Sequence, residues 1–364
     1  MKEVDIIVIG AGPAGLTAAI SAASSGAHVL LVERNKHLGG QLTKQTHMFF
    51  GSEKQYAATR GIDIVGILLD KLQAYEERIQ ILTDATVLGI YEDRVVSVKH
   101  KDTYKTYGSK GIIVATGASE KVLAFPNNDL PGIYGAGAVQ TLMNVYGVRP
   151  ADEVLMVGAG NIGLIVSYQL LQAGVKVKAV IDAAPQIGGY LVHASKLTRM
   201  GVPIYTSHTV KEAIGTDSLR QVVIQELDES WQPIQDTEKI FDVDCLCLSV
   251  GLTPLIELLG QAGCKMRYIR ELSGLVPQRN QEYETSVRGI FVCGDCSGVE
   301  EASSAMVEGY IAGLACAKRC GYTHEEYDAL IMDYKDQLTA LREGPVGDKI
   351  REGVHKATRE VSYA

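Results

Sequence analysis

The chain has 364 residues, of which 46% are hydrophobic and 6% aromatic, with 38 glycines and a formal net charge of -8. This length exceeds the usual size of one domain, so two domains with separate cores are expected. Many glycines and few aromatic residues favour an α/β fold with parallel sheets. The acidic charge, without a long run of Lys or Arg, argues against a nucleic-acid partner.

The sequence also argues against export and membrane insertion. No stretch approaches the roughly 20 uninterrupted apolar residues that a membrane-spanning helix needs. The apolar segment at residues 4–15 lacks the cleavage pattern of a signal peptide, and the seven cysteines do not follow the pattern of a secreted disulfide scaffold. We therefore expect a protein of the reducing cytoplasm.

A strand over residues 5–9 runs into a glycine-rich turn and then a helix as far as Gly26. In such a turn the first glycine permits a tight bend, the second lets the backbone approach a pyrophosphate, and the third lets helix and strand pack closely. The positive end of the helix would face the phosphates. The candidate cofactor-binding residues of this turn are Gly10, Gly12, Pro13, Ala14 and Gly15.

A second strand ends at Glu33, 18 residues after Gly15. A carboxylate at this place can accept hydrogen bonds from the hydroxyls of an adenosine ribose. With the strand, the turn and the acidic residue all in order, the segment predicts a dinucleotide site and not a bare glycine-rich turn. Arg34, directly after Glu33, and Gly40 and Gln41, at the next glycine pair, complete the candidate residues.

The same order of elements recurs 148 residues later, and an internal repeat of this kind indicates a second domain of the same architecture. A strand, a glycine turn, a helix and a second strand are followed by another glycine pair at residues 188–189. The second strand ends at Asp182, and a carboxylate there favours NAD because it would repel the 2′-phosphate of NADP. Lys176 and Lys178 on that strand could pair with a 2′-phosphate, so NADP stays an alternative ligand. The candidate residues of this copy are Gly158, Gly160, Asn161, Ile162, Gly163 and Asp182.

Two further apolar strands, at residues 110–117 and 244–251, are expected to close the two sheets. A last buried strand over residues 288–295 precedes a helix from about residue 300 to residue 319. We therefore predict an α/β chain of two Rossmann-like, three-layer ββα domains, with the second inserted into the first. The predicted domains are residues 1–120 with 253–322, residues 121–252, and a helical C-terminal tail over residues 323–364.

The tail is polar and helix-forming up to Arg342 and is then broken by Gly344-Pro345 and Gly347. We expect it to be a surface appendage or a docking arm.

The glycine turns with Glu33 and Asp182 resemble those of the two-dinucleotide-binding-domain flavoproteins, and the resemblance extends over residues 4–319. It implies FAD in the first domain and a nicotinamide dinucleotide, NAD(H), in the second. It also implies that Asp295 binds the ribityl or pyrophosphate part of FAD and that the following helix, from Glu301 and Ala302, directs its N-terminus at the flavin. Further matching residues are Ala115, Thr116, Gly117 and Gly294.

In this architecture the loop after Gly40 would pass the flavin ring. Lys44 and His47 on that loop are the candidate catalytic residues, since either could tune the flavin or handle a proton. The alternative is that Lys44 is an ordinary surface residue and that His47 has a structural role.

The cysteines argue against a disulfide reductase. The resembling branches carry a redox Cys pair in segments that correspond here to residues 41–51 or 131–140, and both segments lack Cys. The architecture therefore resembles thioredoxin reductase without its redox pair. Cys293 and Cys296 have the right spacing, but Cys293 ends a buried strand, so core packing explains them better. The remaining cysteines do not form two ligand pairs, so no metal site is predicted.

More narrowly, residues 158–164, 182–193 and 294–298 resemble the flavoprotein components of multi-subunit enzymes, namely sarcosine oxidase alpha, opine oxidase A, hydrogen cyanide synthase B and dye-linked L-proline dehydrogenase alpha. Several of these carry a C-terminal Cys cluster for an iron–sulfur centre, whereas the last cysteine here is Cys320. This departure argues against a cluster within the chain and leaves room for a separate acceptor subunit, and we expect an oligomer.

We expect an oxidoreductase that passes hydride between NADH and FAD and electrons to an external acceptor or partner subunit. One alternative is the FAD-binding subunit of an amine, amino-acid or hydroxy-acid dehydrogenase whose substrate is oxidised in another subunit. The second alternative is a non-catalytic nucleotide-sensing or assembly module.

Overall fold

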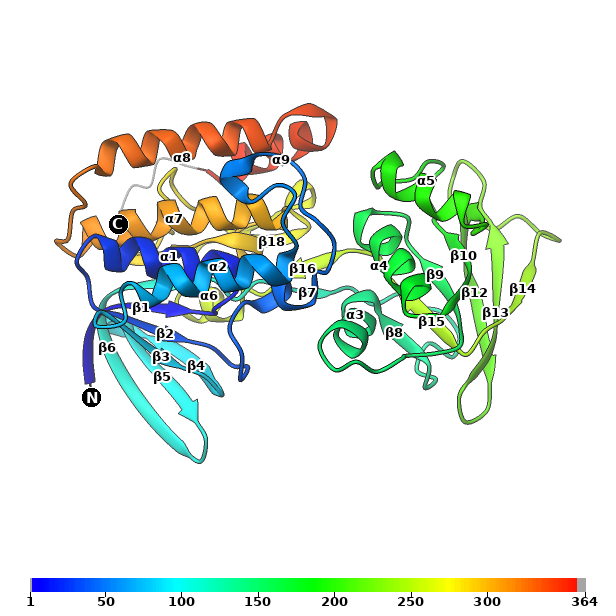
Figure 1. Ribbon diagram of the computed structural model, residues 1–364, viewed down its shortest axis with the longest axis horizontal. Helices are drawn as coiled ribbons and strands as arrows, with labels where there is room; N and C mark the ends of the chain where they lie inside the picture. Colours follow the sequence, from blue (N-terminus) through cyan, green and yellow to red (C-terminus); the bar gives the residue numbers. More distant parts are fainter. Residues whose placement is uncertain (1, 359–364) are drawn as a thin grey trace. The chain divides into compact units, whose positions relative to one another are not determined.

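The computed structural model describes residues 2–358, and the chain folds into two compact units (Figure 1). Unit 1 is formed by the chain up to residue 119 and from residue 252 onward, and unit 2 by residues 120–251. The chain crosses between the units in strands β7 (Ala118–Glu120) and β16 (Leu252–Pro254), which pair with each other.

Unit 1 contains a seven-stranded sheet in the order β3-β2-β1-β6-β5-β4, with β19 also paired to β6. Strands β3, β2, β1, β6 and β19 are parallel, whereas β4 and β5 add an antiparallel extension beside β6. Strand β6 begins seven residues before the predicted strand, because its first half pairs with β5. The strands are β1 (Lys2–Ile9), β2 (Val29–Val32), β3 (Ile79–Leu82), β4 (Ala85–Tyr91), β5 (Val95–His100), β6 (Thr103–Val114) and β19 (Ile290–Val292).

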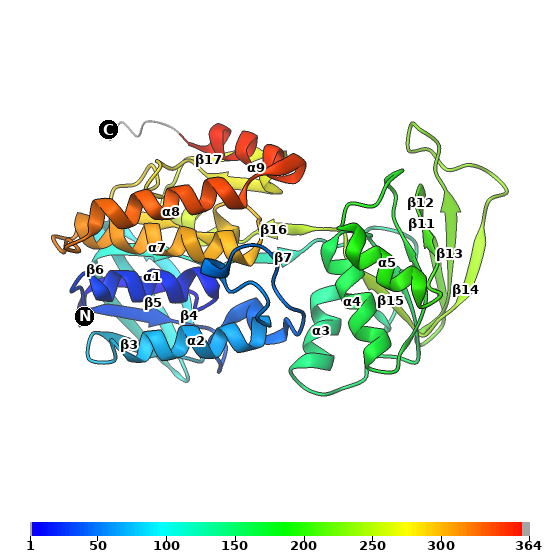
Figure 2. The same cartoon turned by 45° about the horizontal axis from the view of Figure 1, so that its top comes forward.

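Helices α1 (Pro13–Ser24), α7 (Ala302–Arg319) and α8 (Tyr327–Leu341) run alongside one another in both views of unit 1 (Figures 1 and 2). Small residues let α1 and α7 approach closely, since a Cβ added at Gly309 would lie 2.2 Å from the carbonyl oxygen of Ala14. The Thr17 hydroxyl donates to the Met306 carbonyl across this contact. Leu16, Ile113 and Phe291 are among the buried residues of the core that these helices share with the sheet.

The other elements of unit 1 lie around this core. They are α2 (Gly61–Gln73), α6 (Glu257–Gln261), α9 (Gly344–Ala357), the hairpin β17 (Met266–Ile269) and β18 (Gly274–Pro277), and the short 3-10 helices η1 (Gly40–Lys44), η2 (Glu53–Gln55), η3 (Glu92–Arg94), η4 (Arg270–Leu272) and η5 (Gly294–Cys296).

Unit 2 has three layers. A parallel sheet in the order β11-β10-β9-β15-β8 lies between three helices and a second, antiparallel sheet, β12-β13-β14. Leu164 and Val180 belong to the core on the helix side, and Leu155 and Val222 to the core between the sheets. The elements are β8 (Ile133–Gly135), α3 (Ala136–Asn144), β9 (Glu153–Val157), α4 (Asn161–Gln172), β10 (Lys176–Ile181), α5 (Leu191–Arg199), β11 (Ile204–Tyr205), β12 (His208–Gly215), β13 (Leu219–Glu226), β14 (Lys239–Asp242) and β15 (Cys245–Leu248).

These two units confirm the predicted α/β class with two Rossmann-like domains. The C-terminal segment differs from expectation, because α8 is not a surface appendage: Ile331 and Leu338 are buried in the core of unit 1. The predicted end of the helical segment at Arg342 is confirmed, since α8 ends at Leu341 with Arg342 as its C-cap. Pro345 and Gly347, however, belong to a second helix, α9, because proline is tolerated in the first turn of a helix. The last residues of the predicted tail, 359–364, lie outside the described residues. Within residues 2–358, none of the helices has the length and apolar character needed to cross a membrane.

Candidate functional site

The first glycine turn connects the carboxyl end of β1 to α1 and has little free space at two of its glycines. Gly10 has φ +98°, and a Cβ there would lie 2.4 Å from the carbonyl oxygen of Ala115. A Cβ at Gly15 would lie 1.8 Å from the carbonyl oxygen of Gly10. Both positions therefore require glycine for the turn itself to form.

Gly12 differs from these two glycines because the space beside it is open. A Cβ at Gly12 would meet only the Cα of Gly40, at 4.0 Å. Gly12 is also the N-cap of α1, without a side-chain cap and without an acidic residue in the first turn, and Pro13 opens the helix. The first N–H groups of a helix lack intrahelical partners, so this end of α1 can bind an anion such as a pyrophosphate.

Glu33 lies directly after β2 and fixes the shape of the turn. Its Oε2 accepts a hydrogen bond of 2.8 Å from the backbone N–H of Ala11. Its Oε1 accepts from the backbone N–H and the side-chain amide of Asn35, at 2.8 and 2.9 Å. The carboxylate, only 5% exposed, thus ties the end of β2 to the glycine turn. Arg34, the next residue, is exposed.

The second glycine pair packs against the first turn. The N–H of Gly39 donates to the carbonyl of Ala11 at 2.8 Å, and a Cβ at Gly40 would lie 2.8 Å from the Cα of Gly12. Gly40 begins η1, in which Gln41 is exposed.

The two candidate catalytic residues lie on the segment that continues from Gly40. Lys44 is partly buried at the end of η1. His47 stacks on Phe49 with ring centroids 5.8 Å apart, a contact that fits a structural role.

The segment after β6 lies beside the same turn. The N–H of Ala115 donates to the carbonyl of Ile9, and the Thr116 hydroxyl donates to the carbonyl of Leu255, each at 2.8 Å. Gly117 has φ +77°, and a Cβ there would meet nothing within 4 Å. The carboxyl ends of β1 and β6 therefore share an edge of the sheet, where parallel α/β sheets bind their ligands.

Gly294 brings a second chain segment to the start of α1. It has φ +72°, and a Cβ there would lie 2.8 Å from the Cβ of Ala14. Burial, together with the carboxylates of Glu308, Glu300 and Glu301, raises the pKa of the next residue, Asp295, to about 7, against the opposing effect of a backbone hydrogen bond from Glu300. The charge of Asp295 is therefore sensitive to what binds beside it.

Helix α7 begins just after this segment. Its N-cap is Glu301, in an extended conformation and without a side-chain cap, and Ala302 is its first residue. The first turn contains no acidic residue, so the N-cap Glu301 is the acidic residue at the positive end of the helix dipole.

Sequence reasoning missed a buried group of charged residues behind Gly294. Glu308, in the middle of α7, accepts from the Gly294 N–H through Oε2 at 2.9 Å. Its Oε1 accepts from the Tyr283 hydroxyl at 2.9 Å and from Arg342 Nη2 at 2.7 Å. The available signal was an acidic residue in an otherwise apolar stretch of helix, because a buried charge needs a partner.

Unit 2 repeats the geometry of the first turn. A Cβ at Gly158, where φ is +106°, would lie 2.1 Å from the Ser249 carbonyl oxygen. A Cβ at Gly163 would lie 2.0 Å from the carbonyl oxygen of Gly158. Gly160 is the N-cap of α4, again without a side-chain cap, and a Cβ there would meet nothing within 4 Å.

Asp182 takes the place in unit 2 that Glu33 has in unit 1. Its Oδ2 accepts from the Ala159 N–H at 2.7 Å, and its Oδ1 accepts from the Ala184 N–H at 2.9 Å. Asn161 uses its side chain to hold the next turn, since its Oδ1 accepts from the Tyr190 N–H at 2.9 Å. Ile162, beside it, is 42% exposed.

The cysteines are free thiols and all but Cys320 are buried. Burial raises the pKa of Cys296 to about 11 and holds that of Cys293 well above its usual range. In the part of the chain that the structure describes, no cluster of three or more His, Cys, Asp or Glu side chains could hold a metal ion.

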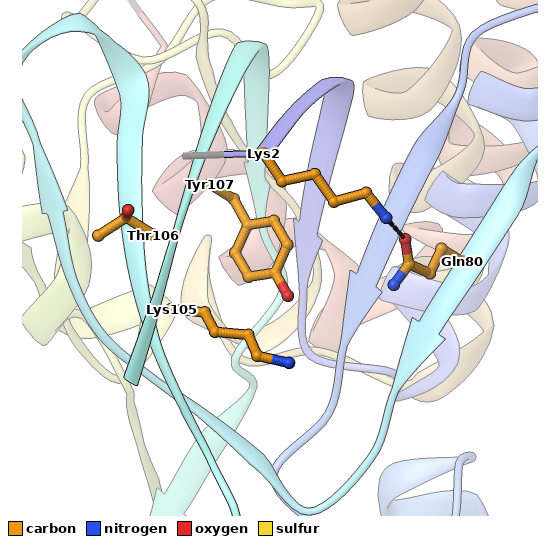
Figure 3. A pocket seen from close by; sticks show the side chains of 5 residues that line it. All are labelled: Lys2, Gln80, Lys105, Thr106 and Tyr107. Carbon is orange, nitrogen blue, oxygen red and sulfur yellow. Dashed lines mark hydrogen bonds between the residues drawn. The ribbon is translucent and has the colours of Figure 1, made fainter. Parts of the chain in front are cut away.

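A hollow on unit 1 lies away from the residues above. It is lined by Lys2, Gln80 and residues 105–107, with Lys2 directed at Gln80 (Figure 3). Lys2 begins β1, and residues 105–107 belong to the first half of β6. The hollow is therefore at the amino end of these strands, opposite the glycine turns.

Residues 4–309 match the pyridine nucleotide-disulphide oxidoreductase family. The chain belongs to this family of FAD- and NAD(P)-dependent oxidoreductases, and the predicted resemblance is confirmed.

Two curated relatives have names that describe components of larger enzymes. Opine oxidase A, the A component of the opine oxidase of Agrobacterium tumefaciens (strain Ach5), is 27% identical over 85% of the chain. Sarcosine oxidase alpha of Corynebacterium sp. (strain P-1) is 29% identical over 87% of the chain. The matches span 65% and 33% of those two proteins, so the chain corresponds to only part of each.

Solved structures show the same fold. Thioredoxin reductase of T. acidophilum matches with a TM-score of 0.72 at 21% identity, covering 87% of this chain and 99% of that one. L-proline dehydrogenase from P. horikoshii matches with a TM-score of 0.69 at 24% identity, covering 93% of this chain and 58% of that one.

Proposed function

We propose that unit 1 binds FAD, that unit 2 binds NAD(H), and that the chain passes hydride between them and electrons to an external acceptor or partner subunit. One observation carries the proposal: each unit has a glycine turn whose backbone N–H is held by a carboxylate at the end of the next strand, beside an uncapped helix. The pairs are Glu33 with Ala11 and Asp182 with Ala159. Membership of the pyridine nucleotide-disulphide oxidoreductase family supports FAD and a nicotinamide dinucleotide as the two ligands.

The residues of unit 1 fit a dinucleotide because they leave room where its phosphates would lie. Gly12 and Gly117 have open space at the positions of their missing side chains, and the N-terminus of α1 supplies N–H groups. Glu33 would bind the adenosine ribose and Asp295 the ribityl or pyrophosphate part. The flavin, when bound, supplies the hydride chemistry. The residues position it and control its charge, and no nucleophilic side chain is required.

NAD is favoured over NADP in unit 2. Asp182 is the acidic residue that suits a free 2′-hydroxyl. Lys176 and Lys178, the two cations that could have favoured a 2′-phosphate, each pair with Glu153 at 3.0 Å. Glu153 begins β9 and Lys176 begins β10, whereas Asp182 follows the end of β10. At least Lys176 is therefore held at the far end of the strand.

We also propose that the chain is not a disulfide reductase, although thioredoxin reductase shares its fold. A redox dithiol needs a thiolate and access to solvent. Cys293 and Cys296 are fully buried, and burial raises the pKa of both thiols. They therefore lack the properties of an attacking pair.

A second function is supported by the names of the relatives, which are subunits of larger oxidases. In that case the chain is the flavin-binding subunit of an amine, amino-acid or hydroxy-acid dehydrogenase, and the organic substrate is oxidised in a partner subunit. The two functions differ in whether NADH alone reduces the flavin.

Anaerobic titration of the FAD-loaded chain with NADH and with NADPH tests the proposal. We expect NADH to bleach the flavin absorbance stoichiometrically and NADPH to require a much higher concentration. A yellow protein that NADH does not bleach would favour the second function, and stable binding of NADH without dye reduction would favour a sensing module. A chain that takes up no FAD would overturn the proposal.

A further inference from the structure

The C-terminal segment reaches the candidate flavin site through one buried side chain. Arg342 follows α8 directly and is 8% exposed. Its Nε donates to Glu300 Oε2 at 2.9 Å, and its Nη2 donates to Glu300 Oε1 and to Glu308 Oε1, each at 2.7 Å. A two-point contact of this kind fixes the orientation of both groups more firmly than a single hydrogen bond.

The two carboxylates that Arg342 binds lie on both sides of Asp295. Glu308 Oε2 accepts the hydrogen bond from Gly294 N–H at 2.9 Å, directly before Asp295. Glu300 is at the end of the same segment, and its backbone donates to Asp295. Arg342 therefore holds the segment 294–300 at its two ends.

A second arginine completes the buried group. Arg279 Nε donates to the Ser297 hydroxyl at 2.6 Å, within the same segment, and its guanidinium lies 4.1 Å from the ring centre of Tyr283. Its Nη2 is 3.8 Å from Glu308. Arg342 is thus one of two cations in the group, and the one supplied by the C-terminal segment.

Helix α8, which Arg342 directly follows, is itself held in place. Ile331 and Leu338 of α8 are buried in the core of unit 1, and Asp333 pairs with Lys54 at 2.6 Å. Tyr334 stacks on Tyr310 of α7 with ring centroids 5.0 Å apart. The position of Arg342 is therefore set by packing and not by its ion pairs alone.

We propose that Arg342 is a positioning residue for the flavin: it fixes the segment 294–300 and offsets the negative charge of Glu300 and Glu308 beside Asp295. The inference rests on the proposed binding of FAD in unit 1, with the ionised Asp295 carboxylate accepting hydrogen bonds from the ribityl hydroxyls. Two buried carboxylates close to a third are unfavourable without a cation, because each raises the pKa of the others. Loss of Arg342 then makes Asp295 harder to ionise and FAD harder to bind.

The charged groups near Asp295 determine whether each substitution raises or lowers the pH at which FAD affinity falls. Glu308, Glu300 and Glu301 all disfavour its ionised form. Arg342→Gln removes the cation that offsets two of them, so the pH at which FAD affinity falls should rise by about one unit. Glu300→Gln removes one negative charge and should move that pH downward. The double variant E300Q/R342Q should return close to the wild-type value.

The experiment measures the Kd for FAD by flavin fluorescence across the neutral pH range for these variants. Lys356→Gln is the matched control, since Lys356 also ties the C-terminal segment to unit 1, through Glu271 at 2.7 Å, but away from Asp295. For R342Q we expect FAD binding on the acidic side of neutrality to weaken about tenfold, and for K356Q no change. Arg342→Lys, which keeps the charge but loses the two-point contact, should lie between R342Q and the wild type.

The outcomes separate this inference from the proposed function. Failure of the wild type to bind FAD overturns both. Wild-type binding with the same pH dependence in R342Q and E300Q overturns only the role of Arg342. Equal weakening in both variants without opposite pH shifts also overturns it, because that result indicates a loss of structure alone. If R342Q does not fold, the E300Q variant decides between the outcomes. A downward shift of the pH at which its FAD affinity falls supports the inference, and the absence of that shift overturns it.

Discussion

The substitution Gly12→Ala should weaken FAD binding while leaving the stability of the fold nearly unchanged. Gly12 has φ -74° and ψ -174°, a conformation open to alanine, and the new Cβ would meet only the Cα of Gly40, at 4.0 Å. Alanine is a poorer N-cap than glycine, which destabilises the protein, but it also reduces the conformational freedom of the unfolded chain, which stabilises it. The two effects oppose each other, so the free energy of unfolding should change by less than about 1 kcal/mol.

The same methyl group would occupy the space that the proposed pyrophosphate needs. An overpacked contact costs about 1–3 kcal/mol, which corresponds to a rise in the Kd for FAD of roughly 5- to 150-fold. The assay is FAD binding by fluorescence, together with urea unfolding of the apo protein. Gly160→Ala is the matched control in unit 2, where a Cβ would meet nothing within 4 Å, and it should weaken NADH binding while leaving FAD binding unchanged.

Gly15→Ala supplies the contrast, because its Cβ would lie 1.8 Å from the Gly10 carbonyl oxygen. We expect it to destabilise unit 1 by about 3 kcal/mol or more. If G12A binds FAD as tightly as the wild type, the phosphates do not lie beside Gly12 and the assignment of the turn is wrong.

Three further predictions concern charged groups. Glu33→Gln should lower the melting temperature and the FAD affinity, because an amide has one acceptor oxygen and cannot accept from both Ala11 and Asn35 in the present geometry. Asp182→Asn should weaken NADH binding only. Calorimetry that finds the binding of the same ligand weakened in both variants would contradict this prediction. The pKa of Asp295 is about 7 in the free protein and should fall when the ribityl hydroxyls of FAD donate to the carboxylate, so FAD binding releases a proton. The Kd for FAD should therefore rise by up to about tenfold per pH unit below neutrality. A Kd for FAD that does not depend on pH would exclude this role of Asp295. Cys320 is partly exposed, and its hydrogen bond with Cys316 lowers its pKa. A thiol reagent should therefore label Cys320 before the other cysteines of the native protein. Rapid labelling that persists in C320S would show that another cysteine reacts and would contradict this prediction.

The parts of the fold that depend on local sequence could be predicted. A glycine turn, its helix and the acidic end of the next strand lie within about 25 residues of one another, so both copies and their order are visible from the residues alone. The geometry at Gly10 and Gly15 follows the same local logic, since each lacks the space for a side chain.

Features that depend on tertiary packing could not be predicted in this way. Arg342 meets Glu308, 34 residues earlier, and Thr17 meets Met306, 289 residues later, and neither spacing follows a helical or strand period. The antiparallel strands β4 and β5 were also missed, because their partly exposed residues give a weak apolar signal. The end of α8 near Arg342 could be predicted, but the start of α9 could not, because Pro345 breaks a helix in its interior and is tolerated in its first turn.

The central claim is that the two turns are separate sites for two different dinucleotides. Calorimetric titration of the apo protein with FAD, followed by titration of the FAD-bound protein with NAD⁺, tests it directly. Our account predicts that NAD⁺ binds the FAD-loaded chain without displacing the flavin. Release of FAD by NAD⁺, or the absence of any second binding event, would contradict it.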